Sequence, residues 1–264
     1  MLRNFTWRGV ALGLFSLLVF LFLVAPLLIV IIVSVNDTQY ISFPLKKPTL
    51  RWYRAIPKYG EFVDAFIVSF ELALFSSLFA TILGTMAAFA LVRGRFPGRN
   101  LINTLIMSPL TLPGVVTGIA MLQFYTWMSM GPSLGRLVLG HTIITLPYVV
   151  RSVSAVLYGF PISLEEAAMN LGANRLRTTF LVTFPIIRSG LLAGAIFSFI
   201  VSFDNVVVSI FLVSPEYNTL PITIFNYVSY SAEPIIASIS TVQIIMIVLL
   251  MVIMEKFVAF SRYM

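Results

Sequence analysis

Six long apolar stretches constrain this sequence more than any other feature. Each exceeds about 18 residues, the length at which an apolar run can cross a bilayer as a helix. Strands of a membrane β-barrel would instead be about ten residues long and alternate in polarity. The sequence therefore predicts an all-α membrane protein with one transmembrane domain over 1–264 and six transmembrane helices, at about 11–33, 65–92, 101–127, 139–158, 190–213 and 236–257.

The composition and net charge of the sequence exclude several classes of function. Only 10% of the residues are charged and 59% are hydrophobic, whereas a soluble domain keeps about a quarter of its residues charged. The absence of cysteine excludes disulfides and thiol catalysis. The net charge is +7. In a membrane protein, excess basic residues orient the chain in the bilayer and bind anionic lipid, so we expect lipid and not nucleic acid as the partner. With both termini inside, ten basic residues flank the spans on the inner side and six on the outer side; we therefore expect cytoplasmic termini.

A polar segment at 159–189 separates two of the apolar stretches. The run Glu165-Glu166-Ala167-Ala168 is followed by Leu171-Gly172-Ala173. Negative charge is favourable near the start of a helix, alanine permits close approach, and glycine permits a tight turn. The segment predicts a short amphipathic helix displayed outside the lipid, as a handle for a soluble partner.

Two further regions are irregular. The loop 34–64 carries three prolines and two aromatic-basic clusters, which favour an interfacial helix on the outer surface; recognition of a partner protein is the alternative. In the third span, Pro109, Pro113, Gly114 and Gly118 predict a bend. That bend is either a packing kink or a break that lines a translocation path, because an open backbone in lipid must be covered by protein or face a water-filled cavity.

The polar segment resembles the cytoplasmic loop of permease subunits of ATP-binding-cassette (ABC) importers. That pattern is Glu-Ala-Ala, three residues, Gly, nine residues, then an apolar residue, any residue, Leu and Pro. Here Glu166-Ala167-Ala168, Gly172 and Val182-Thr183-Phe184-Pro185 match it, with Val and Phe replacing the commoner Ile and Leu. The stretch Ser202 to Ser209 and the tripeptide Thr219-Leu220-Pro221 are similar to the spermidine/putrescine branch.

The resemblance implies a machine of several chains in a bacterial inner membrane. Two ATP-binding subunits would hold ATP and Mg²⁺, a second and paralogous permease would complete the path, and an extracytoplasmic binding protein would deliver substrate. This chain needs no cofactor of its own, since none of its four lysines precedes Ser or Thr and no phosphate-binding loop can form. The residues implied in coupling to the ATPases are Glu165, Glu166, Ala167, Ala168, Leu171, Gly172 and Ala173.

Acidic residues within the spans are candidates for the substrate path, because a carboxylate in lipid is costly and by default functional. Asp204 and Glu71 are predicted to face one outer cavity and bind ammonium groups. Asn205 lies beside Asp204, and Tyr125, Trp127 and Tyr148 would add cation–π attraction. The alternative is that Asp204 pairs with Arg151. His141 is expected near the outer end of the fourth span in a structural role.

Other functions and cargoes stay open at this point. The polyamine branch carries two adjacent acids where this chain has Asp204-Asn205, which favours a ligand with one cationic end, such as γ-aminobutyrate or another small amine. An ion-coupled secondary transporter would carry repeated halves. A membrane enzyme would need a cluster of catalytic side chains, and a metal site would need more ligands than one histidine and scattered acids supply.

Overall fold

The computed structural model describes residues 7–231 and 233–261, with side chains from 10 to 256 apart from 232. These residues form helices and connecting loops, with one isolated bridge between Asn36 and Pro48. The helices are α1 (Trp7–Ser34), α2 (Arg51–Ala55), the 3₁₀ turn Ile56–Lys58, α3 (Gly60–Arg93), α4 (Arg99–Thr111), α5 (Gly114–Trp127), α6 (Leu134–Gly159), α7 (Ile162–Asn170), α8 (Arg175–Thr178), the π-helical turn Thr179–Thr183, α9 (Phe184–Phe203), the 3₁₀ turn Ser209–Phe211, α10 (Leu220–Tyr230) and α11 (Ile235–Ser261).

The all-α class is confirmed, and most of the predicted spans coincide with helices. Among the described residues, five helices are long and apolar enough to cross a membrane. The pair α4 and α5 would supply a sixth if the two count as one span, but they meet at 110°. Pro113, which has no backbone N–H to donate, lies at this break. The expected bend in the third span is therefore a division into two helices, and the count of six stays a prediction.

The fifth span departs from its predicted limits of 190–213. The helix α9 begins at Phe184 and ends at Phe203, so Asp204 lies just beyond its end and not inside it. The cause is local, since the Asn205 side-chain oxygen accepts a hydrogen bond from the Val208 backbone N–H at 2.9 Å. An Asn side chain that bonds the nearby backbone competes with helix continuation.

The chain divides into two compact units, Met1–Gly60 with Asn226–Met246 and Glu61–Phe225 with Ile247–Met264. In the first unit, α2 and the turn after it occupy the place where an interfacial helix was expected, and its position on a membrane stays a prediction. The Tyr53 and Ser34 hydroxyls are 2.6 Å apart and tie α2 to the end of α1.

The same unit holds a tyrosine whose ionisation is disfavoured. Burial, together with a hydrogen bond to Glu233, raises the pKa of Tyr227.

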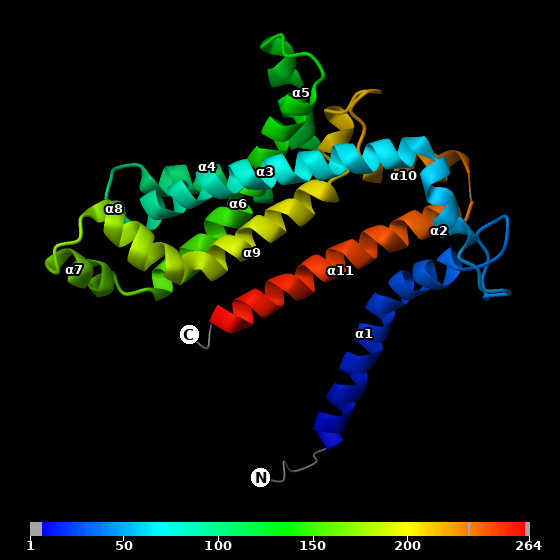
Figure 1. The fold of residues 1–264 in the computed structure, drawn as a ribbon, viewed down its shortest axis with the longest axis horizontal. Helices are drawn as coiled ribbons and strands as arrows, with labels where there is room; N and C mark the ends of the chain where they lie inside the picture. The colour runs from blue at the N-terminus through cyan, green and yellow to red at the C-terminus, as the bar shows by residue number, and fades with distance from the viewer. Residues whose placement is uncertain (1–6, 232, 262–264) are drawn as a thin grey trace. The chain divides into compact units, whose positions relative to one another are not determined.

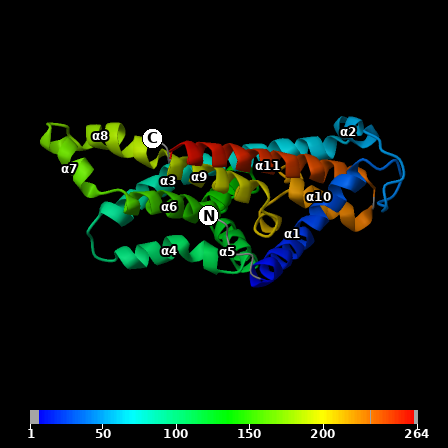
Figure 2. The same cartoon turned by 90° about the horizontal axis from the view of Figure 1, so that it is seen from below.

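The second unit is organised around α6, which lies beside both α3 and α9 (Figures 1 and 2). Val149 of α6 meets a glycine on each neighbour. A Cβ atom added to Gly84 of α3 would lie 2.8 Å from the Val149 Cβ, and one added to Gly194 of α9 would lie 2.9 Å from the Val149 Cα. Gly84, Thr85 and Ala88 are buried, so small residues on this face of α3 let the helices pack closely.

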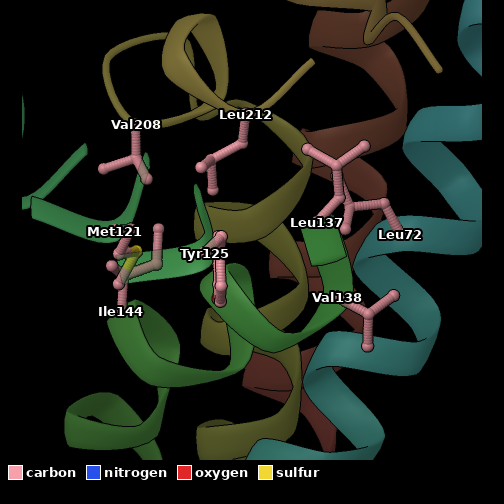
Figure 3. Packing of buried hydrophobic residues seen from close by; sticks show 8 residues of the cluster. All are labelled: Leu72, Met121, Tyr125, Leu137, Val138, Ile144, Val208 and Leu212. Carbon is pink, nitrogen blue, oxygen red and sulfur yellow. The ribbon is translucent and has the colours of Figure 1, made fainter. Parts of the chain in front are cut away.

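The helix α5 packs through one face onto α6 and the segment after α9. Figure 3 shows Met121 and Tyr125 of α5 gathered with Ile144 of α6 and with Val208 and Leu212. A Cβ added to Gly118 would clash with the Phe211 ring, so α5 approaches this segment closely. The broken third span is thus held by protein contacts on the side of the chain's own core.

We expect Gly194→Ala to loosen the contact between α6 and α9. The new methyl group would press on the backbone of α6, and overpacking of this kind costs about 1–3 kcal/mol. Thermal unfolding of the detergent-solubilised protein, followed by tryptophan fluorescence, should show a lower midpoint. The matched control is Gly159→Ala, because a Cβ there meets nothing within 4 Å; equal midpoints for the two variants would contradict the packing argument.

Candidate coupling loop and translocation path

The polar segment folds as a short helix and a tight turn, as the sequence predicted, and a second short helix follows. The helix α7 ends at Asn170, and Gly172 follows with φ +92°. The Gly172 N–H donates to the Met169 carbonyl at 3.0 Å and the Ala173 N–H to the Ala168 carbonyl at 3.1 Å. This pair of bonds is a Schellman motif, in which glycine supplies the left-handed conformation without steric cost.

The surface of the loop is apolar at its tip. Leu171 is 90% exposed beside the turn, and Leu176 of α8 and Met169 of α7 are also exposed. Ala167 is exposed, whereas Ala168 and Ala173 are half-buried. Several exposed apolar side chains gathered on a polar loop are typical of a surface that a protein partner covers.

The two glutamates of the loop point to different surroundings. Glu166 is exposed, whereas the Glu165 carboxylate lies 3.2 Å from the Arg93 Nη2 atom at the end of α3. The Thr183 hydroxyl also donates to this carboxylate at 3.3 Å. Sequence reasoning treated both glutamates as partner-facing, and it missed Arg93 and Thr183 because nothing in the sequence pattern pairs them with Glu165.

A cavity of about 160 Å³ lies at the break between α4 and α5, and we call it the break cavity. Tyr148 of α6 and Asn205 both line it, so the structure brings these two predicted path residues together. Its other walls come from the broken span, from α6 and α9, and from the segment after α9: Pro109, Leu110, Leu112, Gly114, Thr117, Ile144, Val201 and Val208.

A larger pocket of about 540 Å³ lies between α4 and α6, and we call it the arginine groove. Arg99 and Arg151 line it, and the Arg99 Nη2 atom donates to the Tyr158 hydroxyl at 3.1 Å. Leu110 lines both this groove and the break cavity. The two hollows are therefore neighbours along α4.

Asp204 lies exposed on a turn that His141 holds in place. The imidazole is fully buried, with its Nδ1 atom 2.9 Å from the Ser202 hydroxyl and its Nε2 atom 3.0 Å from the Ser209 hydroxyl. Because the Ser209 hydroxyl donates its proton to the Asn205 carbonyl, the His141 Nε2 atom carries the proton and Nδ1 accepts from Ser202. The structural role expected for His141 is thus a clamp across the end of α9.

Three other predicted path residues lie elsewhere. Glu71 is exposed on α3, and helical spacing sets it on the face opposite the buried Leu72, Ala73 and Ser76 side. Tyr125 is 3% exposed within the core, with its ring 5.5 Å from the Arg136 guanidinium. Trp127 is 80% exposed at the end of α5. None of these three lines the break cavity with Tyr148 and Asn205.

The alternative pairing of Asp204 with Arg151 is not what the structure favours. Arg151 lies ten residues beyond His141 on α6, which is about 15 Å along a helix. Since His141 contacts the turn that holds Asp204, Arg151 belongs to a different level of the molecule. Among the described residues, no group of three or more His, Asp or Glu side chains is placed to hold a metal.

Comparison with known proteins assigns the family. The model of the binding-protein-dependent transport system inner membrane component matches residues 80–261, more than half of the chain. The chain belongs to this family. It is a permease subunit of the ABC importer type, and not an enzyme.

Relatives of this permease align over most of its length. It is 33% identical over 244 residues to the putrescine transport system permease protein PotI of Escherichia coli, covering 89% of this chain and 84% of the relative. It is 29% identical over 247 residues to the spermidine/putrescine transport system permease protein PotC of the same organism, covering 94% and 93%.

Solved structures agree on the fold. A bacterial ABC transporter involved in the import of the acidic polysaccharide alginate has a TM-score of 0.70 at 14% identity, covering 97% of this chain and 99% of that one. The MetNI methionine ABC transporter has a TM-score of 0.63 at 17% identity, covering 78% and 98%. At these identities the likeness concerns the ABC permease fold alone.

We expect His141→Ala to free the turn of the permease that carries Asp204. The change would leave two buried hydroxyl groups without the imidazole, at about 1–3 kcal/mol each. Backbone amides in 204–213 should therefore exchange hydrogen for deuterium about tenfold faster or more. Thr142→Val is the control, since the Thr142 hydroxyl bonds only a carbonyl of its own helix; the same exchange rate in both variants would argue against the clamp.

Proposed function

We propose that this permease passes a small cationic solute, putrescine or spermidine, across a bacterial inner membrane at the expense of ATP hydrolysed by partner subunits. The observation that supports this most is its similarity to two polyamine permeases over about nine-tenths of its length. The exposed carboxylate of Asp204 is a natural partner for an ammonium group.

The proposed assembly has two ATP-binding subunits, a second and paralogous permease, and an extracytoplasmic binding protein. The α7 loop docks on an ATP-binding subunit, with Leu171 and Glu166 toward it. Both termini are then cytoplasmic, α9 runs outward, and Asp204 belongs to the outer half of the path. ATP and Mg²⁺ are held by the partners alone.

A smaller amine is the second candidate, and Asn205 is the reason for keeping it. Asn205 supplies the oxygen that caps Val208, which an aspartate would also supply, but it removes one negative charge beside Asp204. A ligand with one cationic end, such as γ-aminobutyrate, needs a single carboxylate partner.

We expect Asp204→Asn to weaken uptake while ATP hydrolysis persists. Hydrogen bonds to a charged group contribute about 1.5–3 kcal/mol, so the apparent KM for the cation should rise at least about tenfold. The measurement is ATP-driven uptake of labelled putrescine into proteoliposomes that hold the partner subunits, with spermidine and γ-aminobutyrate as competitors. Glu216→Gln is the control, because Glu216 is an exposed acid on the same segment.

The results of this assay distinguish a polyamine cargo from a smaller amine. Competition by spermidine, and a lower KM for putrescine in Asn205→Asp, would support the polyamine. Uptake of γ-aminobutyrate in place of putrescine would favour the smaller amine. An unchanged KM in Asp204→Asn would remove Asp204 from the path, and no ATP-driven uptake by the wild type would reject the proposed cargo.

We expect Leu171→Asp to release the ATP-binding subunit without unfolding the permease. A charge on a central apolar side chain of an interface commonly costs more than 1 kcal/mol, so co-purification of the ATP-binding subunit should fall severalfold. Tyr230→Asp is a matched control, since Tyr230 is 92% exposed on α10. Full co-purification of the subunit by Leu171→Asp would contradict a docking role for the loop tip.

A further inference from the structure

The end of α3 is fastened to the coupling loop by a small polar cluster. The Arg93 guanidinium approaches the Glu165 Oε1 atom with Nη2 at 3.2 Å and with Nε at 3.3 Å. The same Nη2 atom donates to the Phe160 carbonyl at 3.1 Å, and the Phe160 ring lies 5.5 Å from the guanidinium carbon. One arginine therefore holds both the first turn of α7 and the residue that ends α6.

The cluster is sheltered from solvent. The Arg93 and Glu165 side chains are 20% and 15% exposed, and Thr183, which gives Glu165 a further donor, is buried. Exposed ion pairs contribute little because water screens them and the side chains stay mobile. A carboxylate oxygen that accepts two hydrogen bonds and pairs with a guanidinium in a sheltered site is instead fixed in direction.

The connections of α7 show what this contact adds. The chain itself joins α7 to α6 through Phe160 and Pro161, and to α9 through α8 and the turn Thr179–Thr183. Only side chains join it to α3, which ends at Arg93 and is separated from Glu165 by 72 residues. Without the Arg93 contact, a displacement of α7 would be transmitted to α6 and α9 through the chain itself, but to α3 only through helix packing.

We propose that Arg93 and Glu165 form a latch that carries the movement of the coupling loop to α3. Arg93 is a positioning residue, because it acts through Glu165 and meets neither ATP nor substrate. The proposal rests on the proposed function and divides the two glutamates of the loop: Glu166 faces the ATP-binding subunit, and Glu165 faces inward to bind α3.

The test compares uptake with ATP consumption in the assembled transporter. Glu165→Gln keeps the shape of the side chain and removes its charge, and Arg93→Gln removes the guanidinium. Arg95→Gln is the matched control, since Arg95 is exposed two residues further on and its loss changes net charge equally. The readouts are co-purified ATP-binding subunit, ATP hydrolysis, and labelled putrescine taken up per ATP hydrolysed.

We expect both latch variants to assemble and hydrolyse ATP, with putrescine uptake per ATP reduced at least about fivefold, the lower end of typical coupling free energies. Arg95→Gln should match the wild type. The double variant that combines Arg93→Glu with Glu165→Arg keeps an ion pair with the charges exchanged, so it should regain part of the lost uptake per ATP. If the loop needed each residue only for folding, the double variant would regain none of it. Thr183→Val, which keeps the ion pair, should reduce the ratio less than Glu165→Gln.

Two results would overturn the latch. One is an unchanged uptake per ATP in Glu165→Gln. The other is a parallel loss of the co-purified ATP-binding subunit and of uptake, because the contact would then only shape the docking surface. A wild-type transporter without ATP-driven putrescine uptake would instead count against the proposed function, so the two failures are distinguishable.

Discussion

The close approach of three helices around Val149 is the contact on which the rest of the second unit depends. In lipid, helices gain little from burying apolar surface and are held by close packing. Gly84 and Gly194 allow α3 and α9 to reach the same residue of α6 from two sides. Each candidate functional feature is positioned by a residue on α6 or at its end. These residues are His141 of the clamp, Tyr148 in the break cavity, Arg151 in the arginine groove, and Phe160 beside the coupling loop.

Two interruptions of helical structure meet on this frame. The third span breaks before α5, and α9 ends before Asp204. Backbone groups released at such breaks need partners, since lipid supplies none. The Asn205 side chain caps Val208, and His141 ties Ser202 to Ser209 across the second break. Both interruptions border the break cavity, whose lining includes the polar side chains of Thr117, Tyr148 and Asn205.

Features that depend on neighbouring residues were predictable, and those that depend on distant ones were not. Apolar runs located the helices, and the Gly172 turn followed from local chemistry. The end of α9 was missed because the apolar residues after Asn205 prolong the hydropathy signal, while the cap that stops the helix is one hydrogen bond. Tyr125 and Tyr148 look alike in sequence, yet one packs in the core and the other lines the break cavity. The Arg93–Glu165 contact joins residues 72 apart and has no local signature.

The charges along α6 give the proposed route a direction. On the proposed function, a cation would be attracted at the level of Asp204, where a carboxylate lies exposed and Tyr148 and Asn205 line the adjoining cavity. Arg151 lies about 15 Å beyond His141 along α6 and lines the arginine groove together with Arg99 of α4, and like charges repel. A cationic cargo would therefore be retained near Asp204 and not in the groove. Binding and departure would then belong to different levels of the molecule, and a cation leaving toward the cytoplasmic side would have to pass the positive charge of the groove.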